Sequence, residues 1–284
     1  MYKRQVLTRN PLRAQEVIGQ AQAAHWDPLD GPPDASVFAG TSVIFNLAGE
    51  PVAEGRWSDD KNQRIRNSRV IGTRNLVAGI AEAAEKPKVL VSASAVGYYG
   101  DRGDEKLDEQ SHAGTGFLAE VCEEWEHEAM AAEALGVRVV CVRIGIVLAE
   151  DGGALKKMLP PFTLGVGGRL GSGKQWMAWV HIDDLVGILL HCSRTESVRG
   201  AVNASSPNPA TNAEFTKALG KALGRPAFLP VPKTALRVAL GEMSKMLLAS
   251  QRALPKAALA SGYQFQHGAL DDALGAALSK PGQQ

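Results

Sequence analysis

The chain has 284 residues, of which 45% are hydrophobic, and its 31 basic and 30 acidic residues give a formal net charge of +1. This composition supports a full hydrophobic core and argues against a disordered chain, and the charge balance lacks the basic footprint of a DNA- or RNA-binding domain. No apolar run reaches the roughly 20 residues that a membrane helix needs, and the first residues lack the apolar core of a signal peptide. We therefore expect a cytoplasmic protein without a nucleic-acid or membrane partner.

The cysteines and histidines predict neither a disulfide framework nor a metal centre. Cys122, Cys141 and Cys192 are widely spaced and form no C-x-x-C pair, so we expect reduced and mostly buried thiols. The six histidines contain no H-x-x-x-H or H-E-x-x-H spacing, so no metal site is predicted.

Four short β-branched runs in the first half are typical of strands buried on both faces, as in a parallel sheet. They cover residues 5–8, 42–47, 89–92 and 137–143. Apolar residues at helical spacing fill residues 59–84 and 117–135, and the second of these helices stops at Gly136. The alternation predicts an α/β fold with a Rossmann-like, doubly wound parallel sheet, which we assign to residues 1–150.

The pattern changes after about Val147. Glycines and two prolines crowd the stretch up to Gly173, and the signals of a helix, a strand and a second helix then follow, at 182–192, at 201–203, and from Thr211 or Asn212 onward. The last stretch, 234–278, is Ala/Leu-rich and helical. We expect 151–284 to hold a substrate-binding cap region and a small, mostly helical C-terminal domain, partly interleaved with the first domain.

The glycine cluster at residues 165–173 does not supply a phosphate-binding loop. It misses the G-x-G-x-x-G spacing because Leu170 stands where a glycine is required, and it follows Pro160, Pro161 and Phe162 where a strand is required. Two interpretations stay open: a flexible loop near the mouth of a substrate site, and a plain surface loop.

The end of the first strand signal holds a candidate cofactor ligand. A Rossmann domain needs a strand, a Gly-rich turn and a helix N-terminus, and no such unit opens this chain; the first strand ends in Thr8-Arg9-Asn10. In dinucleotide-binding folds the end of the second strand meets the adenine ribose, where an arginine accommodates the 2′-phosphate of NADP. Arg9 stands in such a place, and a surface arginine after a strand is the alternative interpretation.

Two other strand ends hold small or polar residues. Asn46-Leu47-Ala48-Gly49 follows one buried strand, and small side chains there let the backbone approach a ligand closely. Ser94 ends the next strand, where its hydroxyl is placed to hydrogen-bond a carbonyl oxygen. The alternatives are a simple strand-to-loop turn for the first and a cap or turn residue for the second.

Together these segments resemble the extended short-chain dehydrogenase/reductase superfamily, and most closely its atypical epimerase-like branch, often labelled as sugar-nucleotide epimerases or cell-division inhibitors. The resemblance covers nearly the whole chain. The segments that carry it are residues 8–11, 46–51, 56–57, 68–73, 92–100, 117–118, 125–126, 143–148, 171–175, 179–185 and 254–255, and a tail similar to that branch's small C-terminal domain of unknown function.

The resemblance implies a Rossmann domain with NADP as the cofactor and a small-molecule substrate of unknown identity. It places Thr8 and Arg9 at the adenosine phosphate end and Leu47 and Ala48, between Asn46 and Gly49, against the cofactor. Arg64 and Arg69 match helix positions that face the cofactor, although a solvated helix face is their alternative. The stretch from Arg143 to Val147 matches the strand end beside the nicotinamide.

The chain departs from the family pattern at its start. The opening strand, Gly-rich loop and first helix have no counterpart in it, because only five residues precede Val6. We therefore expect a chain that lacks a βα unit of about 30 residues, such as a fragmentary gene model would give. The loss of an interior strand would expose apolar strand edges and weaken cofactor binding.

The second departure concerns catalysis. The Tyr-x-x-x-Lys pair of active short-chain dehydrogenases falls on Phe117 and Val121, which cannot move a proton. Tyr98 or Tyr99 could exchange the proton while Ser94 orients a carbonyl and the cofactor supplies the hydride chemistry; aromatic packing is the alternative for both tyrosines. The leading hypothesis is an NADP-dependent oxidoreductase or epimerase, the rival is a non-catalytic NADP-sensing binding protein, and a third possibility is a truncated chain without activity.

Overall fold

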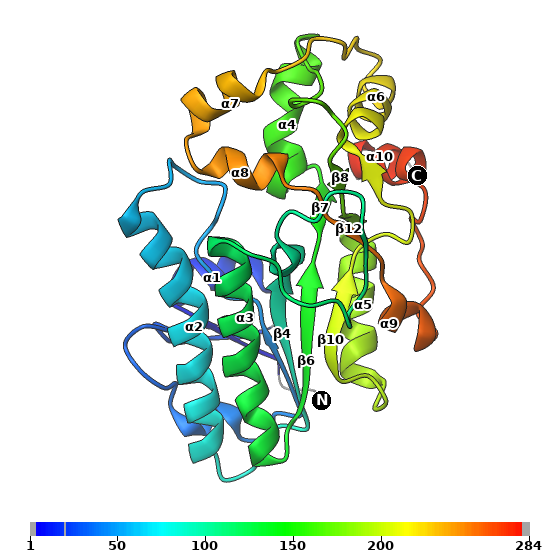
Figure 1. The fold of residues 1–284 in the computed structure, drawn as a ribbon. Helices are drawn as coiled ribbons and strands as arrows, with labels where there is room; N and C mark the ends of the chain where they lie inside the picture. Colours follow the sequence, from blue (N-terminus) through cyan, green and yellow to red (C-terminus); the bar gives the residue numbers. More distant parts are fainter. Residues whose placement is uncertain (1–3, 20, 280–284) are drawn as a thin grey trace.

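The computed structural model describes residues 4–19 and 21–279, and it confirms an α/β fold built on a parallel sheet. Figure 1 shows helices in front of and behind a central set of strands, with further helices gathered above the carboxyl ends of those strands. In the first half the elements are β1 (Gln5–Thr8), α1 (Pro11–Val17), β2 (Gln22–His25), β3 (Val43–Asn46), α2 (Asp59–Glu82), β4 (Val89–Ala95), β5 (Lys106–Leu107), α3 (Phe117–Met130), β6 (Arg138–Ile144) and β7 (Ile146–Ala149).

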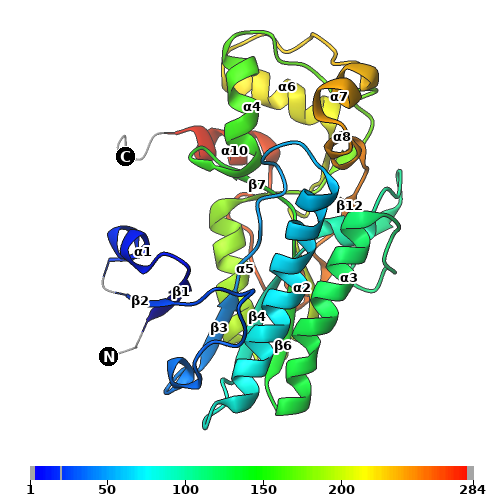
Figure 2. The same cartoon turned by 90° about the vertical axis from the view of Figure 1, so that its left-hand side faces the viewer.

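The four strands β10, β6, β4 and β3 form the main sheet in that order, and every pair in it is parallel. β1 and β2 form a separate parallel pair. Figure 2 shows the sheet nearly edge-on, with α2 and α3 on one side and α1 and α5 (Ile182–Arg194) on the other. The sheet is therefore covered by helices on both sides, as predicted for a doubly wound fold.

Some elements of the second half belong to the sheet and its covering helices, and others form the upper part of the molecule. Its elements are α4 (Gly153–Thr163), β8 (Trp176–Met177), β9 (Trp179–His181), α5, β10 (Gly200–Ala204), β11 (Ala210–Thr211), α6 (Asn212–Ala222), α7 (Lys233–Leu240), α8 (Met243–Leu248), β12 (Arg252–Ala253), α9 (Lys256–Ala260) and α10 (Leu270–Leu278). Short 3₁₀ helices cover Ala35–Phe38, Val96–Tyr99 and Ala131–Leu135. No helix among the described residues combines the length and apolar character that crossing a membrane requires.

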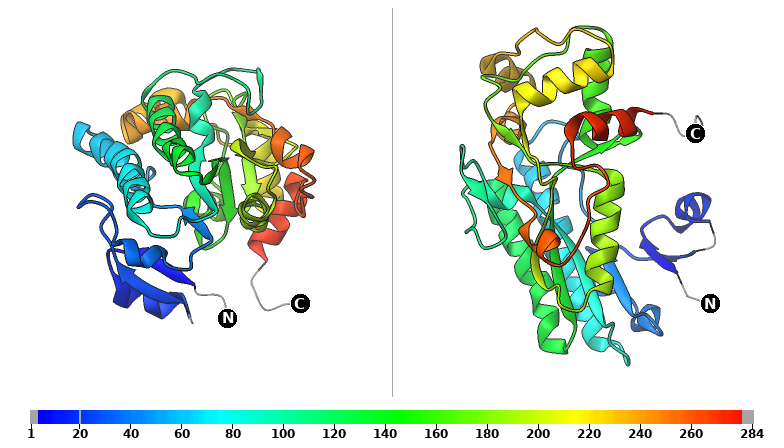
Figure 3. Two further views of the ribbon diagram at one scale, coloured as in Figure 1. Left: turned by 90° about the horizontal axis from the view of Figure 1, so that it is seen from below. Right: turned by 90° about the vertical axis from the view of Figure 1, so that its right-hand side faces the viewer.

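Two apolar clusters sandwich the main sheet, whose central strands β4 and β6 are buried on both faces, while Phe45 of β3 is exposed. Alternate strand residues such as Val91 and Val140 pack against α5, and their neighbours Leu90 and Val139 pack against α2 and α3. A further cluster, which includes Trp179 and Phe215, joins β7, α4, α6 and α10 above the sheet (Figure 3). Segments of the second half thus contribute to both the sheet and the upper part.

Some elements have no clear sequence signal. Helix α1 buries none of its residues, so no amphipathic pattern predicts it; the Asn10 side chain caps it by accepting from the Arg13 N–H at 3.1 Å, and Pro11 fills its first position. Helix α4 forms although Pro160 and Pro161 lie within it, in its last turn. The predicted helical stretch after 234 is divided among α7 to α10, with Gly241 ending α7.

Candidate functional site

The parallel strands β3, β4 and β6 end at one edge of the sheet, where α/β folds bind their ligands. Their register aligns Ala95, at the end of β4, with Ile144, at the end of β6. A buried polar network lies at this edge. Figure 1 shows that the edge is below the upper helices. Such a network is informative because buried polar groups persist only where partners satisfy them.

An ion pair between Arg143 and Glu126 is the centre of this network. The Arg143 side chain is 4% exposed. Its Nε and Nη2 atoms each donate to a carboxylate oxygen of Glu126 at 2.8 Å. Its Nη1 donates to the Tyr99 hydroxyl at 3.0 Å. Burial lowers the pKa of Arg143, but the hydrogen bonds and the charge of Glu126 outweigh burial and raise this pKa above its ordinary value.

The network also engages two predicted catalytic residues. Ser94 is 2% exposed and donates to Glu126 Oε1 at 2.6 Å. Tyr99 is fully buried, and its hydroxyl donates to Asn203 Oδ1 at 2.7 Å. Burial raises the pKa of Tyr99 to about 12. Ser94, Tyr99 and Arg143 therefore lie in one network, in which their polar atoms are bonded to protein partners.

Tyr98 differs from its neighbour. It is partly exposed, and the Arg143 guanidinium lies over its ring, 3.4 Å from the ring centroid, which is a cation–π contact. Its hydroxyl makes no hydrogen bond with another described residue, in contrast to that of Tyr99. Of the two tyrosines, Tyr98 is the one that a ligand could reach.

The loop after β3 presents both buried and exposed residues. The Asn46 amide is buried and donates to Thr73 Oγ1 at 2.9 Å and to Ser92 Oγ at 3.2 Å. Leu47, Ala48 and Gly49 are exposed. Asn46 thus anchors the strand end to the core, while the three residues after it form the surface that a ligand could contact.

Two arginines of α2, Arg69 and Arg64, lie beneath this loop in different environments. Arg69 is partly buried, donates from Nη1 to the carbonyl oxygens of Glu50 and Ile65, both at 3.1 Å, and has its pKa lowered by burial. Arg64 is 58% exposed and lies 3.6 Å from Glu50 Oε1. Lys61 is 6% exposed and donates to Glu50 at 2.6 Å. This partly buried ion pair joins the loop that carries Gly49 to α2.

The end of β1 is accessible. Arg9 is exposed and forms no hydrogen bond or ion pair with another described residue. Thr8 is partly buried and its Oγ1 accepts from the Asn10 N–H at 3.2 Å. The Arg9 guanidinium is therefore available to an anion.

The remaining predicted positions are structural in character. Phe117 opens α3 with its ring edge-on to Trp57 at 5.7 Å between centroids, and Val121 is buried. Val147 lies in β7 opposite Val180 of β9 and packs on the apolar cluster beside α5. Sequence reasoning did not single out Glu126, although the pair Trp125-Glu126 carried part of the family resemblance.

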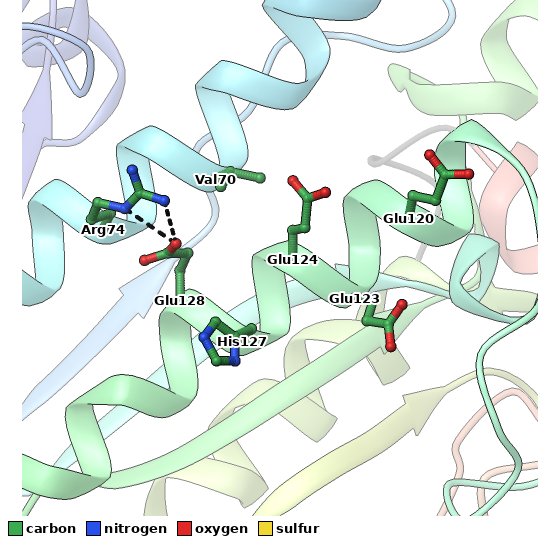
Figure 4. Close-up of a pocket in the computed structure, with 7 residues that line it drawn as sticks. All are labelled: Val70, Arg74, Glu120, Glu123, Glu124, His127 and Glu128. Carbon is green, nitrogen blue, oxygen red and sulfur yellow. Dashed lines mark hydrogen bonds and ion pairs between the residues drawn. The ribbon is translucent and has the colours of Figure 1, made fainter.

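Two surface hollows lie apart from this network. One, of about 370 Å³, lies between the outer faces of α2 and α3, and Figure 4 shows Arg74 paired with Glu128 within it, at 2.6 Å. The other, of about 570 Å³, is lined partly by Lys174 and Trp176, which follow the glycine cluster. That cluster is tightly packed: a Cβ on Gly168 would lie 1.5 Å from the Leu229 carbonyl oxygen.

One group of possible metal ligands, His181, Asp183 and His267, occurs among the described residues. The His181 Nδ1 accepts from the Asp183 N–H at 3.2 Å and so caps helix α5. The His181 Nε2 is buried without a hydrogen-bond partner in the described chain, but a cation beside this group would lie against the positive end of the helix. Helix capping accounts for the position of the His181 ring.

The sequence pattern of the NAD dependent epimerase/dehydratase family matches residues 11–204, and that of a domain of unknown function, DUF1731, matches 231–277. The chain belongs to the NAD dependent epimerase/dehydratase family. It is 41% identical over 278 residues to the epimerase family protein Mb2239 of Mycobacterium bovis, which covers 98% of this chain and 89% of that protein.

Two solved structures of the same kind are similar to it. The human epimerase family protein SDR39U1 (isoform 2), crystallised with NADPH, aligns with a TM-score of 0.83 and 35% identity over 95% of this chain and 88% of its own. A nucleoside-diphosphate sugar epimerase of Corynebacterium glutamicum aligns with a TM-score of 0.72 and 34% identity, over 96% of this chain and 57% of its own. These likenesses confirm the family resemblance and the Rossmann-like fold.

Proposed function

We propose that this chain is an NADP-binding oxidoreductase or epimerase that acts on a small molecule. The observation that carries the cofactor assignment is Arg9, which directly follows β1 and whose exposed guanidinium has no acidic partner among the described residues. A planar guanidinium binds phosphate with two hydrogen bonds, which suits the 2′-phosphate of NADP. The NADPH in the human relative, 35% identical to this chain, supports the same choice.

The described residues offer contacts to the adenosine phosphate end of such a cofactor and along the sheet edge. Thr8 and Arg9 would hold its adenosine phosphate end, and the exposed stretch Leu47–Gly49 would contact it at the sheet edge, above the partly buried Arg69. The bound cofactor would supply hydride transfer. Arg143 would act indirectly, because all of its donor atoms are engaged by Glu126, Tyr99 and a backbone carbonyl.

For the chemical step we propose Tyr98 as the residue that exchanges a proton with substrate. Its hydroxyl is unengaged within the described chain, whereas the Tyr99 hydroxyl is buried and bonded to Asn203. Ser94 would orient a substrate carbonyl once its hydroxyl turns from Glu126. The cation over the Tyr98 ring would hold the ring in place.

A second candidate is a non-catalytic protein that senses NADP. Phe117 and Val121 favour it because neither can transfer a proton, and so does the closed hydrogen bond between Ser94 and Glu126. The two candidates share the cofactor site and differ only in turnover.

We further propose that residues 1–150 form the nucleotide-binding domain and that 151–284 supply the substrate cap and C-terminal domain. The apolar cluster around Trp179 and Phe215 supports a cap with its own core. A cytoplasmic location is proposed because Cys122, Cys141 and Cys192 are all free and buried.

The experiment that tests the proposed function is a titration of the purified chain with NADPH and with NADH, followed by nicotinamide fluorescence. Preference for NADPH by tenfold or more, about 1.4 kcal/mol, supports the assignment, and a folded chain that binds neither contradicts it. A screen of nucleotide sugars and small carbonyl compounds then separates the candidates: turnover that Tyr98→Phe abolishes identifies the enzyme, and binding without turnover favours the sensor.

A further inference from the structure

The surface hollow beside β8 has the size of a small-molecule site. Its volume is about 570 Å³, within the roughly 300–1,000 Å³ of small-molecule pockets. Its walls are residues 103–104, residues 172–176, the beginnings of α6 and α7, and the end of α8 with Ser250. Figure 1 shows β8 between the upper helices and the main sheet. We name this hollow the indole pocket, after the Trp176 side chain in its wall.

The indole pocket is separate from the polar network at the sheet edge. Trp176 and Met177 form β8, and successive side chains of a strand point to opposite sides. Met177 packs in the apolar cluster above the sheet, whereas Trp176 lines the pocket. No side chain in the pocket wall belongs to the network around Arg143. A ligand in the indole pocket would therefore leave the sheet edge free.

Two lysines from distant parts of the chain line this pocket. Lys174 and Lys233 are exposed, and neither ammonium forms a hydrogen bond or ion pair with another described residue. The Lys233 stem lies against the turn that precedes Lys174, because a Cβ on Gly171 would lie 2.9 Å from Lys233 Cγ. An ammonium group binds phosphate as a point charge. The pocket thus offers two uncompensated cations to an anionic ligand.

The indole wall is apolar and held in place. The Arg252 guanidinium lies over the Trp176 ring, 4.0 Å from the ring centroid, and Trp176 Nε1 donates to Asp104 Oδ1. Asp104, the acidic residue of the wall, is also paired with Arg252 at 3.3 Å, so its charge is balanced within the protein. Leu248 adds an aliphatic side chain to the wall. An organic group can pack against these two side chains.

The segments that build the pocket are strongly basic, although the whole chain has a formal net charge of only +1. Residues 152–180 hold four basic residues and no acidic one, and residues 205–252 hold seven basic and two acidic residues. The summed field of such a region raises the local concentration of anions. Charge complementarity therefore favours an anionic ligand at this place.

We propose that the indole pocket binds a small organic phosphate, with its phosphate on Lys174 and Lys233 and its organic group against Trp176 and Leu248. The two cations account for the phosphate, and the apolar wall accounts for the organic group. The volume of the pocket leaves room for both. This site is distinct from the proposed cofactor site at Arg9, so the inference stands whether or not the chain binds NADP.

The test follows the indole N–H resonance of Trp176 in proton–nitrogen NMR spectra while phenyl phosphate is added. Trp176→Phe assigns this resonance among those of the five tryptophans. Inorganic phosphate and phenol are titrated in parallel, because each carries one half of the probe. Lys174→Gln and Lys233→Gln each remove one cation from the pocket. Lys217→Gln, at an exposed position on α6 outside the pocket wall, is the matched control.

Phenyl phosphate should shift the Trp176 resonance saturably and bind at least tenfold more tightly than inorganic phosphate or phenol, about 1.4 kcal/mol. Each pocket lysine variant should weaken this binding roughly tenfold, whereas Lys217→Gln and Arg9→Gln should leave it unchanged. An unmoved resonance, or a shift that the pocket lysine variants do not weaken, would overturn the proposal. So would equal affinity for inorganic phosphate, because the indole wall would then contribute nothing. Phenyl phosphate binding by a chain that does not bind NADPH would count against the proposed function only.

Discussion

The buried ion pair between Arg143 and Glu126 allows the most direct test of the site's architecture. Glu126→Gln keeps the shape of the side chain but removes the negative charge that balances Arg143. Because these side chains are 4% and 13% exposed, Arg143 would be left as a poorly compensated buried cation. We expect Glu126→Gln to lower the free energy of unfolding.

The magnitude follows from burial. Removal of one partner of a buried pair costs about 3–5 kcal/mol, and each kcal/mol shifts the melting temperature of a domain of this size by roughly 2–4 °C. We therefore expect a fall on the order of 10 °C. The matched control is Glu124→Gln on the same helix, because Glu124 pairs with Arg66 where both side chains are exposed, at 37% and 42%. That change should cost about 1 kcal/mol or less.

Urea unfolding followed by tryptophan fluorescence measures both changes, together with Arg143→Met and the double variant Arg143→Met/Glu126→Gln. The double variant removes both charges, so its cost should be smaller than the sum of the two single changes by about 1–3 kcal/mol. Strict additivity, or a Glu126→Gln cost no larger than that of Glu124→Gln, would refute the view that this pair organises the site.

The loop after β3 and the tightly packed glycine cluster at residues 165–173 give two further predictions. The hydrogen bond from Lys61 lowers the pKa of Glu50 below its ordinary 4.5, so the stabilisation is complete above that value and is lost as the pH falls through the lowered pKa. Glu50→Gln should thus destabilise the chain by about 1–3 kcal/mol at pH 7, and the difference from the unchanged chain should shrink below about pH 4.5 in urea titrations. A pH-independent difference would contradict this. Gly168→Ala should lower the melting temperature because its Cβ would meet the Leu229 carbonyl, whereas Gly275→Ala, in α10 with no atom within 4 Å of its Cβ, should leave it equal or higher. Equal behaviour of the two alanine variants in a thermal melt would be the contrary result.

The sequence predicted where the strands lie, and the expected burial on both faces holds for β4 and β6. It was wrong for β1, none of whose residues is fully buried, and for β3, in which Phe45 is exposed. Residues 89–92, for example, became the core of β4, Val89–Ala95. The helix 59–84 was also readily recognised, since its apolar spacing reflects one buried face in α2. In contrast, α1 has no buried residue to leave a pattern, and its stability depends on a local cap.

The polar network was not predictable in the same way. Ser94 and Arg143 were each singled out, but the residue that joins them, Glu126, lies on a separate helix 32 positions from Ser94 and 17 from Arg143. Such pairing depends on how α3 packs across β4 and β6, which no local pattern records. Likewise, nothing in the dipeptide Tyr98-Tyr99 predicts that the Tyr99 hydroxyl is buried and the Tyr98 hydroxyl accessible.

The most direct test of the proposed cofactor assignment is the effect of Arg9→Gln on NADPH binding compared with NADH binding. The substitution removes the cation but little volume, and Arg13→Gln, another exposed arginine close by on α1, is the control. If Arg9 holds the 2′-phosphate, Arg9→Gln should weaken NADPH binding at least tenfold, about 1.4 kcal/mol, and leave NADH binding and the control unchanged. Equal affinity for NADPH in Arg9→Gln and the unchanged chain, or an equal loss for both cofactors, would contradict the assignment.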